Sequence, residues 1–249
     1  SANLLSAMRT GAIPGVGAKY LANPDSEVCA ICGPGVMGRT ALAALTAACP
    51  NLRRLKVKGR GRASLDRFTA HVRETYPQFA EIEAVDTVEE LVKDADVIAF
   101  TNTGGTDPST YPFVKGEWLK PGALILGLSA FDMEDEFLAR KCRLVVDNMR
   151  LYEAWEEEFP YPSFGANNII GSKFTDMAHD GKLDKKEIYD LGDIIYGRRP
   201  GRESPEQILV MSVGGMPVED VAWGKVCYDN AVRLGLGTKL KLWDRPDMC

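Results

Sequence analysis

The sequence predicts an α/β protein in which a mainly parallel, doubly wound sheet is flanked by helices. Three observations support this fold class. Short apolar segments alternate with helical patterns over residues 27–147, which is typical of parallel strands joined by helical crossovers. The first apolar segment stops at a glycine-rich turn, and a helical pattern follows at once. The 249 residues and 45% hydrophobic content suit one large or two small domains.

The elements follow from these patterns in chain order. Residues 2–22 predict a helix whose small side chains permit close packing against a neighbour. The expected strands are 27–32, 54–58, 82–85, 96–100, 124–128, 144–147 and 208–213. The expected helices are 36–48, 63–75, 88–93, one near 133–141, 184–196 and a long last helix that Pro217 opens and Gly235 caps.

We expect three parts along the chain. Residues 1–22 form a connecting helix, and residues 23–213 form a nucleotide-binding domain. Residues 150–183 interrupt that domain as an aromatic and acidic insertion, which would cover the site or a partner subunit. Residues 214–249 form the final helix and a tail.

Composition narrows the classes of function. The net charge of −5 disfavours nonspecific nucleic-acid binding, and no apolar segment approaches the length of a membrane span. Cys29 and Cys32 form a C-x-x-C pattern, but alternation along a strand places them on opposite faces. Only two histidines occur, so we expect no metal site. The opening residues show no secretory pattern, and we expect a cytoplasmic protein.

The glycine-rich turn predicts a site for a dinucleotide. In Gly33-Pro34-Gly35-Val36-Met37-Gly38 the first glycine makes the tight turn and the second admits the pyrophosphate. The third glycine lets the helix pack on the strand. The helix beginning at Val36 and Met37 would offer free N–H groups to the phosphates. The alternative is a glycine-rich turn that serves packing only.

The end of the second strand predicts which dinucleotide binds. NAD-binding proteins usually place an acid here for the ribose hydroxyl, whereas this chain has Lys58-Gly59-Arg60-Gly61-Arg62-Ala63-Ser64. Arg60 and Arg62 would bind a 2′-phosphate, and Ser64 would donate to it or cap the next helix. We therefore expect NADP(H) in preference to NAD(H), although NAD(H) remains possible. The alternative is a solvated basic loop.

Several segments together resemble the ornithine cyclodeaminase/mu-crystallin family of NAD(P)-dependent proteins, which implies a Rossmann-type fold. These segments are Met8-Arg9-Thr10-Gly11-Ala12, the glycine turn through Thr40, Arg198-Arg199-Pro200-Gly201-Arg202-Glu203-Ser204-Pro205-Glu206 and Ser212-Val213-Gly214.

The resemblance implies catalytic roles for two side chains. Arg9 is similar to the arginine that holds the substrate carboxylate, whereas alone it reads as a surface arginine on a packing helix. Asp132 falls where the family has an acid that relays a proton, and its alternative role is to cap the helix near 133–141.

Other positions match cofactor contacts of the family. Thr101 and Thr103 fall on the nicotinamide side, Ser212 borders the nicotinamide ring, and Arg60 matches an arginine of NADP-binding members. Two departures stand out: Glu134-Asp135-Glu136 replaces the family's Pro-Gly-Lys, and Gly127 replaces its asparagine. Family members also carry an N-terminal substrate and dimerisation lobe, and we expect that this chain lacks it. A homodimer through that lobe is the expected assembly.

Three functions follow from the resemblance. The first is an NADP(H)-dependent oxidoreductase that acts on a small α-imino or α-amino acid, with Arg9 on the carboxylate and Asp132 on the proton. The second is a cyclodeaminase of the ornithine cyclodeaminase type with catalytic NAD. The third is a non-catalytic NADP(H)-dependent binding protein, like mu-crystallin.

Overall fold

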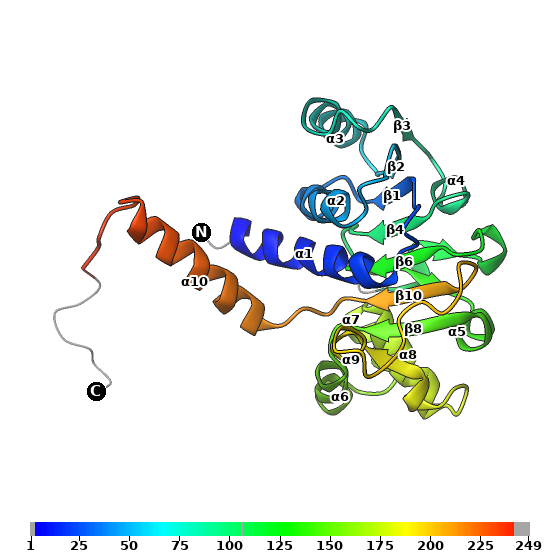
Figure 1. The fold of residues 1–249 in the computed structure, drawn as a ribbon. Helices are drawn as coiled ribbons and strands as arrows, with labels where there is room; N and C mark the ends of the chain where they lie inside the picture. Colours follow the sequence, from blue (N-terminus) through cyan, green and yellow to red (C-terminus); the bar gives the residue numbers. More distant parts are fainter. Residues whose placement is uncertain (1–2, 106, 242–249) are drawn as a thin grey trace, which may run out of the picture.

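One parallel sheet organises the molecule, as the computed structural model shows for residues 3–105 and 107–241 (Figure 1). In this described part, eight strands lie in the order β3-β2-β1-β4-β6-β10-β8-β9. They are β1 (Val28–Cys32), β2 (Arg54–Lys58), β3 (Glu81–Ala84), β4 (Val97–Phe100), β6 (Leu124–Gly127), β8 (Cys142–Val146), β9 (Ile188–Asp190) and β10 (Ile208–Ser212). The predicted fold class is confirmed.

Helices cover both faces of this sheet. They are α1 (Asn3–Leu21), α2 (Val36–Ala48), α3 (Arg62–Thr75), α4 (Val88–Val92), α5 (Asp135–Lys141), α6 (Met149–Glu158), α7 (Phe164–Asn167), α8 (Ile170–His179), α9 (Leu191–Ile195) and α10 (Pro217–Arg233). One apolar core holds side chains of α1, α2, α3 and α9, and the other holds side chains of α4 to α8. Short strands β5 (Phe113–Val114) and β7 (Asp132–Met133) pair outside the main sheet.

Strand alternation separates the two cysteines of the C-x-x-C pattern, as predicted. Cys32 packs in the core that holds side chains of α4 to α8, whereas Cys29 packs in the core that holds side chains of α1, α2, α3 and α9. Burial raises the pKa of the Cys32 thiol to about 11, and it also raises the pKa of Cys29. Both thiols are therefore protonated at neutral pH. Within the described ranges, no three His, Cys, Asp or Glu side chains form a group suited to a metal ion.

Small residues let α1 lie directly on α2. A Cβ atom at Gly11 would lie 2.2 Å from Thr40 Oγ1, and one at Gly15 would lie 2.6 Å from Ala44 Cβ. These approaches leave no room for side chains, so the glycines fix the distance between the two helix axes. This packing places the N-terminal half of α1 beside the start of α2.

Residues 184–196 differ from the expected single helix. Asp184 caps a 3₁₀ turn over Lys185–Glu187, strand β9 follows, and α9 begins only after Asp190. The Asp190 carboxylate accepts the Gly192 N–H group at 2.8 Å, so it caps a new helix instead of continuing an old one. The expectation of one helix was wrong because two capping aspartates divide the segment.

The aromatic segment 150–183 lies on the sheet itself. Tyr152 of α6, Phe164 of α7 and Phe174 of α8 are buried in one core with Phe100 of β4 and Phe131. Burial of these rings accounts for part of the segment's aromatic content, whereas Tyr161 is exposed. Three helices of this region therefore form part of one sheet-covering layer.

The last helix projects from the sheet and lies beside α1 (Figure 1). Gly235 adopts φ +65° directly after the capping residue Leu234, as a helix stop requires. No side chain of α10 is buried, and Val221 and Tyr228 are among its exposed residues. In the described part of the chain, no helix is long and apolar enough to cross a membrane. Residues 242–249 of the expected tail lie outside the described residues.

The contact between α1 and α2 is testable through Gly11. Alanine is the better helix former by about 1 kcal/mol, yet the new methyl group would overlap Thr40. We expect Gly11→Ala to lower the free energy of unfolding by about 2 kcal/mol in urea titrations. The control is Gly224→Ala in α10, where the nearest atom lies 3.5 Å from the new Cβ and no loss is expected. An unchanged or raised stability of Gly11→Ala would contradict this account.

Candidate nucleotide site

A cleft of about 600 Å³ opens at the carboxyl ends of β1, β2 and β4. Ligands of open α/β sheets bind at this edge, where neighbouring strands send their connections to opposite faces. The lining residues are Cys32, Gly33, Pro34, Gly35, Lys58, Gly59, Arg60, Gly61, Ser64, Val88, Thr101, Asn102, Thr103, Thr110, Tyr111, Pro112 and Phe113. The cleft thus brings together six of the predicted cofactor residues: Gly33, Gly35, Arg60, Ser64, Thr101 and Thr103.

The glycine turn has the geometry that its sequence predicts. Gly33 adopts φ +102°, and a Cβ there would lie 2.5 Å from the Asn102 backbone nitrogen. A Cβ at Gly38 would lie 2.4 Å from the Gly33 carbonyl oxygen, so the third glycine lets α2 approach the turn. A Cβ at Gly35 would meet nothing within 4 Å, because this glycine faces open space. Of the three turn glycines, Gly35 is thus the one whose Cβ position is open space.

The Thr101 hydroxyl holds the backbone of the glycine turn in place. Its hydroxyl lies 2.8 Å from the Gly33 carbonyl oxygen and 3.0 Å from that of Cys32, and its side chain is buried. Thr101, which we predicted on the nicotinamide side of a cofactor, thus braces the glycine turn.

The start of α2 leaves N–H donors for an anion. Gly35 is the capping residue, and it has no side chain to satisfy the first N–H groups of the helix. The first backbone bond back to the cap runs from Arg39 N–H to the Gly35 carbonyl oxygen at 3.1 Å. Val36, Met37 and Gly38 lie in the first turn, where helix N–H groups and the helix dipole favour phosphate.

Two cations stand at the β2 end of the cleft. Arg60 is exposed and lines it, and Lys58 also lines it while donating to the Asp86 carbonyl oxygen at 2.7 Å. No Asp or Glu occurs among the described lining residues. The lining therefore has the charge that an extra phosphate requires.

The two other residues predicted for the phosphate lie differently. Arg62 pairs with Asp66 at 3.0 Å, its side chain is 83% exposed, and it does not line the cleft. Ser64 is the third residue of α3 and accepts from Arg67 at 3.2 Å. Gly61 is the capping residue of α3, so the alternative capping role of Ser64 was wrong.

Asn102 is a lining residue that sequence reasoning missed. Its side-chain N–H donates to the Ala130 carbonyl oxygen at 3.0 Å, whereas its buried side-chain oxygen has no partner among the described residues. Its position between Thr101 and Thr103, directly after a buried strand, was the available indication. Thr103 beside it is exposed.

Asp132 lies at the start of β7, beyond the lining of the cleft, and its nearest cation is Lys173. Backbone contacts hold the aspartate: its N–H donates to Pro112 at 2.9 Å, and its carboxylate accepts the Met133 N–H group at 2.8 Å. The Lys173 ammonium of α8 pairs with the same carboxylate. Glu134 caps α5, so the alternative capping role of Asp132 was wrong.

The pairing of Lys173 with Asp132 could not be predicted from the sequence, because the two residues lie about forty positions apart. Its ammonium also lies 2.6 Å from the Met133 carbonyl oxygen and 2.9 Å from the Asp135 carboxylate. Its side chain is 13% exposed, so this ion pair is largely shielded from water. Despite burial, contacts with Lys182 and Lys173 hold the pKa of Asp135 below its usual value.

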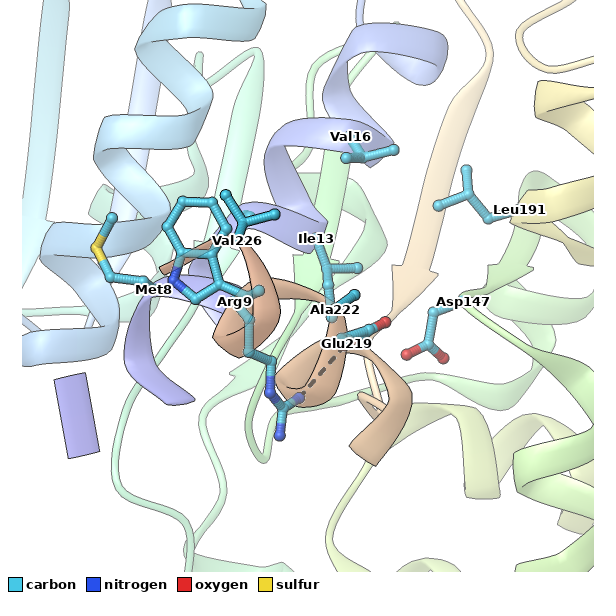
Figure 2. Close-up of a pocket in the computed structure, with 11 residues that line it drawn as sticks. Met8, Arg9, Ile13, Val16, Asp147, Leu191, Glu219, Ala222 and Val226 are labelled. Carbon is cyan, nitrogen blue, oxygen red and sulfur yellow. Dashed lines mark hydrogen bonds and ion pairs between the residues drawn. The ribbon is translucent and has the colours of Figure 1, made fainter. Parts of the chain in front are cut away.

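The predicted substrate arginine lines a second cavity. Arg9 contributes to a pocket of about 500 Å³ between α1, α10 and the end of β8, where apolar residues such as Ile13, Val16 and Val226 form the walls (Figure 2). Its guanidinium lies 3.0 Å from Asp220 and 3.5 Å from Glu219. The structure therefore does not bring Arg9 into the cleft of the glycine turn.

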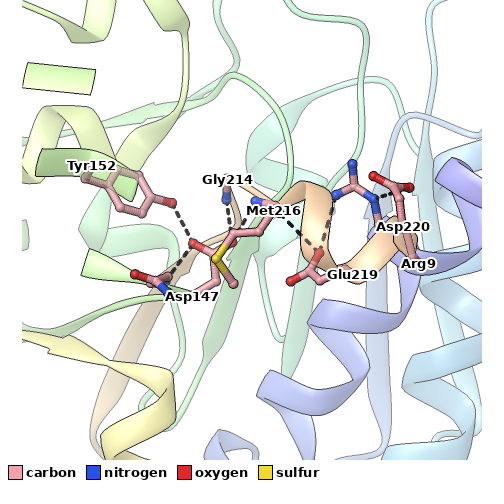
Figure 3. Close-up of polar contacts among 9 residues, drawn as sticks. Arg9, Asp147, Tyr152, Gly214, Met216, Glu219 and Asp220 are labelled. Atoms are coloured by element: carbon pink, nitrogen blue, oxygen red, sulfur yellow. Dashed lines mark hydrogen bonds and ion pairs between the residues drawn. The ribbon is translucent and has the colours of Figure 1, made fainter. Parts of the chain in front are cut away.

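A chain of polar contacts links this second cavity to the sheet (Figure 3). The Asp147 carboxylate accepts the Gly214 and Gly215 N–H groups at 2.9 and 2.7 Å, and the Tyr152 hydroxyl donates to it at 3.1 Å. Burial raises the pKa of Asp147 although these hydrogen bonds oppose the shift, and burial also raises the pKa of Glu219 against the effect of Arg9. Asp147 thus anchors the segment that leads from β10 to α10.

Ser212 takes part in this anchor rather than in the cleft. It is fully buried, and its hydroxyl oxygen accepts the Gly171 N–H group and lies 2.9 Å from the Tyr152 hydroxyl. The structure thus separates Ser212 from the lining of the cleft.

The pairing of Lys173 is testable through protein stability. Lys173→Met leaves the Asp132 carboxylate without its cation in a partly buried place, so we expect a loss of about 2 kcal/mol in unfolding free energy. Urea titration at neutral pH measures it. Lys182→Met is the control, because Lys182 also contacts Asp135 but is 46% exposed, and it should cost less. Equal losses in the two variants would contradict a special role for Lys173.

Several known proteins are similar to nearly the whole chain. The chain is 27% identical to the Δ1-pyrroline-2-carboxylate reductase of Thermococcus litoralis, solved in complex with NADH and L-proline; the match has a TM-score of 0.75 and covers 96% of this chain and 68% of that one. It is 28% identical to an alanine dehydrogenase of Archaeoglobus fulgidus, over 97% of this chain and 68% of that protein.

A third relative matches the chain with similar identity and coverage. An N-((2S)-2-amino-2-carboxyethyl)-L-glutamate dehydrogenase of Staphylococcus aureus is 26% identical over 97% of this chain and 66% of its own length. The chain thus spans about two thirds of the length of these relatives. The model of the ornithine cyclodeaminase/mu-crystallin family matches residues 1–234, and the chain belongs to that family.

Proposed function

We propose that the chain serves an NADP(H)-dependent oxidoreductase that interconverts a small α-imino acid and an α-amino acid. One observation carries the proposal: the cleft combines the glycine turn and the start of α2 with Arg60 and Lys58, and none of its described lining residues is a carboxylate. The relatives named above reduce imino acids or oxidise amino acids according to their names, which supports the same reaction class here.

The residues of the cleft fit a nicotinamide dinucleotide. The open face of Gly35 and the N–H groups of Val36, Met37 and Gly38 suit its pyrophosphate, and Arg60 suits a 2′-phosphate. When bound, such a cofactor supplies or accepts a hydride ion. Two solved relatives hold NADH or NAD, so the preference for NADP(H) rests on the residues of this chain alone.

From the family resemblance, we propose that two side chains act on the substrate, although Arg9 lines the pocket beneath α10 and Asp132 lies beyond the lining of the cleft. Arg9 holds the carboxylate of the substrate, because a guanidinium binds a carboxylate through two parallel hydrogen bonds. Glu219 and Asp220 hold that guanidinium at the carboxyl edge of the sheet, and the substrate carboxylate would displace one of them. Asp132 carries the proton that the substrate nitrogen gains or loses, and Lys173 keeps its carboxylate in place.

We further propose a homodimeric, cytoplasmic enzyme. An archaeal alanine dehydrogenase with 25% identity and a TM-score of 0.75 is described as a dimer, which supports the assembly. Exposed apolar side chains on α10, such as Val218 and Val221, offer area for such a contact.

The choice of cofactor is testable through the two arginines. Arg60→Ala should weaken NADPH binding about tenfold and leave NADH binding unchanged, because only the 2′-phosphate needs the guanidinium. Calorimetric titration measures both affinities. Arg62→Ala is the matched control, since Arg62 pairs with Asp66 outside the cleft and should change neither affinity. Equal effects of Arg60→Ala on NADPH and NADH would refute the assignment.

The reaction class is testable with a panel of 2-oxo acids offered together with ammonia or methylamine. We expect NADPH consumption with at least one member, and Asp132→Asn should lower kcat about 100-fold while the Kd of NADPH stays the same. Full turnover by Asp132→Asn would remove the proton role from this residue. Ammonia release from an amino acid without net change in NADPH absorbance would instead indicate a cyclodeaminase.

A further inference from the structure

The side chain of Asn102 is held in one orientation. Its amide N–H donates to the Ala130 carbonyl oxygen at 3.0 Å, and its own backbone carbonyl oxygen accepts the Ser129 hydroxyl. Because an amide has its oxygen and nitrogen on opposite branches, the bond to Ala130 fixes where the oxygen Oδ1 lies. Oδ1 is therefore a preorganised acceptor.

That oxygen is the one buried side-chain N or O atom without a hydrogen-bond partner in residues 3–105 and 107–241. A buried acceptor without a donor costs roughly 1–3 kcal/mol, so a donor that reaches Oδ1 would recover free energy of that order. Asn102 lines the main cleft and an adjoining cavity of about 160 Å³. A ligand in the cleft would lie against this residue, and a small shift of the Asn102 side chain would bring Oδ1 to a donor of that ligand.

The sheet order indicates which half of a dinucleotide reaches Asn102. β1, which carries the glycine turn, lies between β2 and β4. A dinucleotide with its pyrophosphate at the turn places its adenosine toward the β2 side, where Arg60 stands, and its nicotinamide nucleoside toward the β4 side. Asn102 directly follows Thr101 at the end of β4, on the nicotinamide side.

We propose that Asn102 Oδ1 accepts a hydrogen bond from the nicotinamide nucleoside of the bound cofactor. The inference rests on the proposed function, because it needs a dinucleotide in the cleft. Two groups of that nucleoside can donate, namely the carboxamide N–H group and the ribose hydroxyl groups. Asn102 is then a cofactor-binding residue that distinguishes the complete dinucleotide from its adenosine half.

The experiment compares two ligands by calorimetric titration: NADPH and adenosine 2′,5′-bisphosphate, which lacks the nicotinamide nucleoside. Asn102→Ala should weaken NADPH binding about tenfold, the factor that corresponds to about 1.4 kcal/mol. Its affinity for the bisphosphate should stay within about twofold of the wild type, since that ligand offers Oδ1 no donor.

Ser129→Ala is the matched control. It removes the hydroxyl that holds the Asn102 backbone but keeps Oδ1, so the affinity for NADPH should stay near that of the wild type. An unchanged NADPH affinity in Asn102→Ala, an equal loss for both ligands, or an equal loss in Ser129→Ala would each overturn the inference. Failure of the wild type to bind either ligand would overturn the proposed function itself, and the inference with it.

A measurement on the unaltered protein identifies the donor and does not depend on how well the variant folds. The 3-acetylpyridine analogue of NADP replaces the carboxamide N–H group with a methyl group. If the carboxamide donates, the wild type should bind the analogue about tenfold more weakly than NADP, and Asn102→Ala should bind both alike. If a ribose hydroxyl donates, the wild type binds both alike, and Asn102→Ala weakens both together. Discrimination that persists in Asn102→Ala contradicts contact with Oδ1.

Discussion

The close approach of two chain segments at the ends of β1 and β4 determines the geometry of the site. Gly33 lies against the backbone of Asn102 with a positive φ and no space for a side chain, and the Thr101 hydroxyl holds the Gly33 carbonyl oxygen. The start of α2 depends on this turn, because Gly38 in turn lies against Gly33. A larger residue at Gly33 would force apart the ends of β1 and β4 at the turn where we propose that phosphates bind.

A second set of contacts joins α1 to the start of α10, at the carboxyl edge of the sheet. The glycines of α1 fix it on α2, and the contacts of Arg9 with Glu219 and Asp220 attach the start of α10. Asp147 holds the connecting segment through the Gly214 and Gly215 N–H groups. Asp147 and Glu219 therefore both lie where the segment after β10 leads into α10. Burial at this place raises the pKa of both carboxyl groups.

Local patterns were sufficient to predict the glycine turn and seven of the eight strands described in the main sheet, whereas β9 was predicted to be helical. Buried parallel strands are continuous apolar segments, and the conformational demands of Gly33 and Gly38 are local. The prediction of one helix over 184–196 failed because the helical pattern of the segment masked the capping role of Asp190. Lys173 and the unpaired oxygen of Asn102 were beyond prediction, since both depend on contacts between distant segments that no sequence spacing specifies.

The family resemblance correctly identified the fold and the class of protein, whereas the structure divides its predicted residues between two cavities. Gly33, Gly35, Arg60, Ser64, Thr101 and Thr103 line the cleft, while Arg9 lines the pocket beneath α10. The central claim is that a nicotinamide dinucleotide binds in the first of these. Backbone amide resonances of the ¹⁵N-labelled protein test it most directly during titration with NADP. The account predicts the largest shifts at Gly35, Val36 and Met37; shifts confined to residues around Arg9 and α10, or none at all, would contradict it.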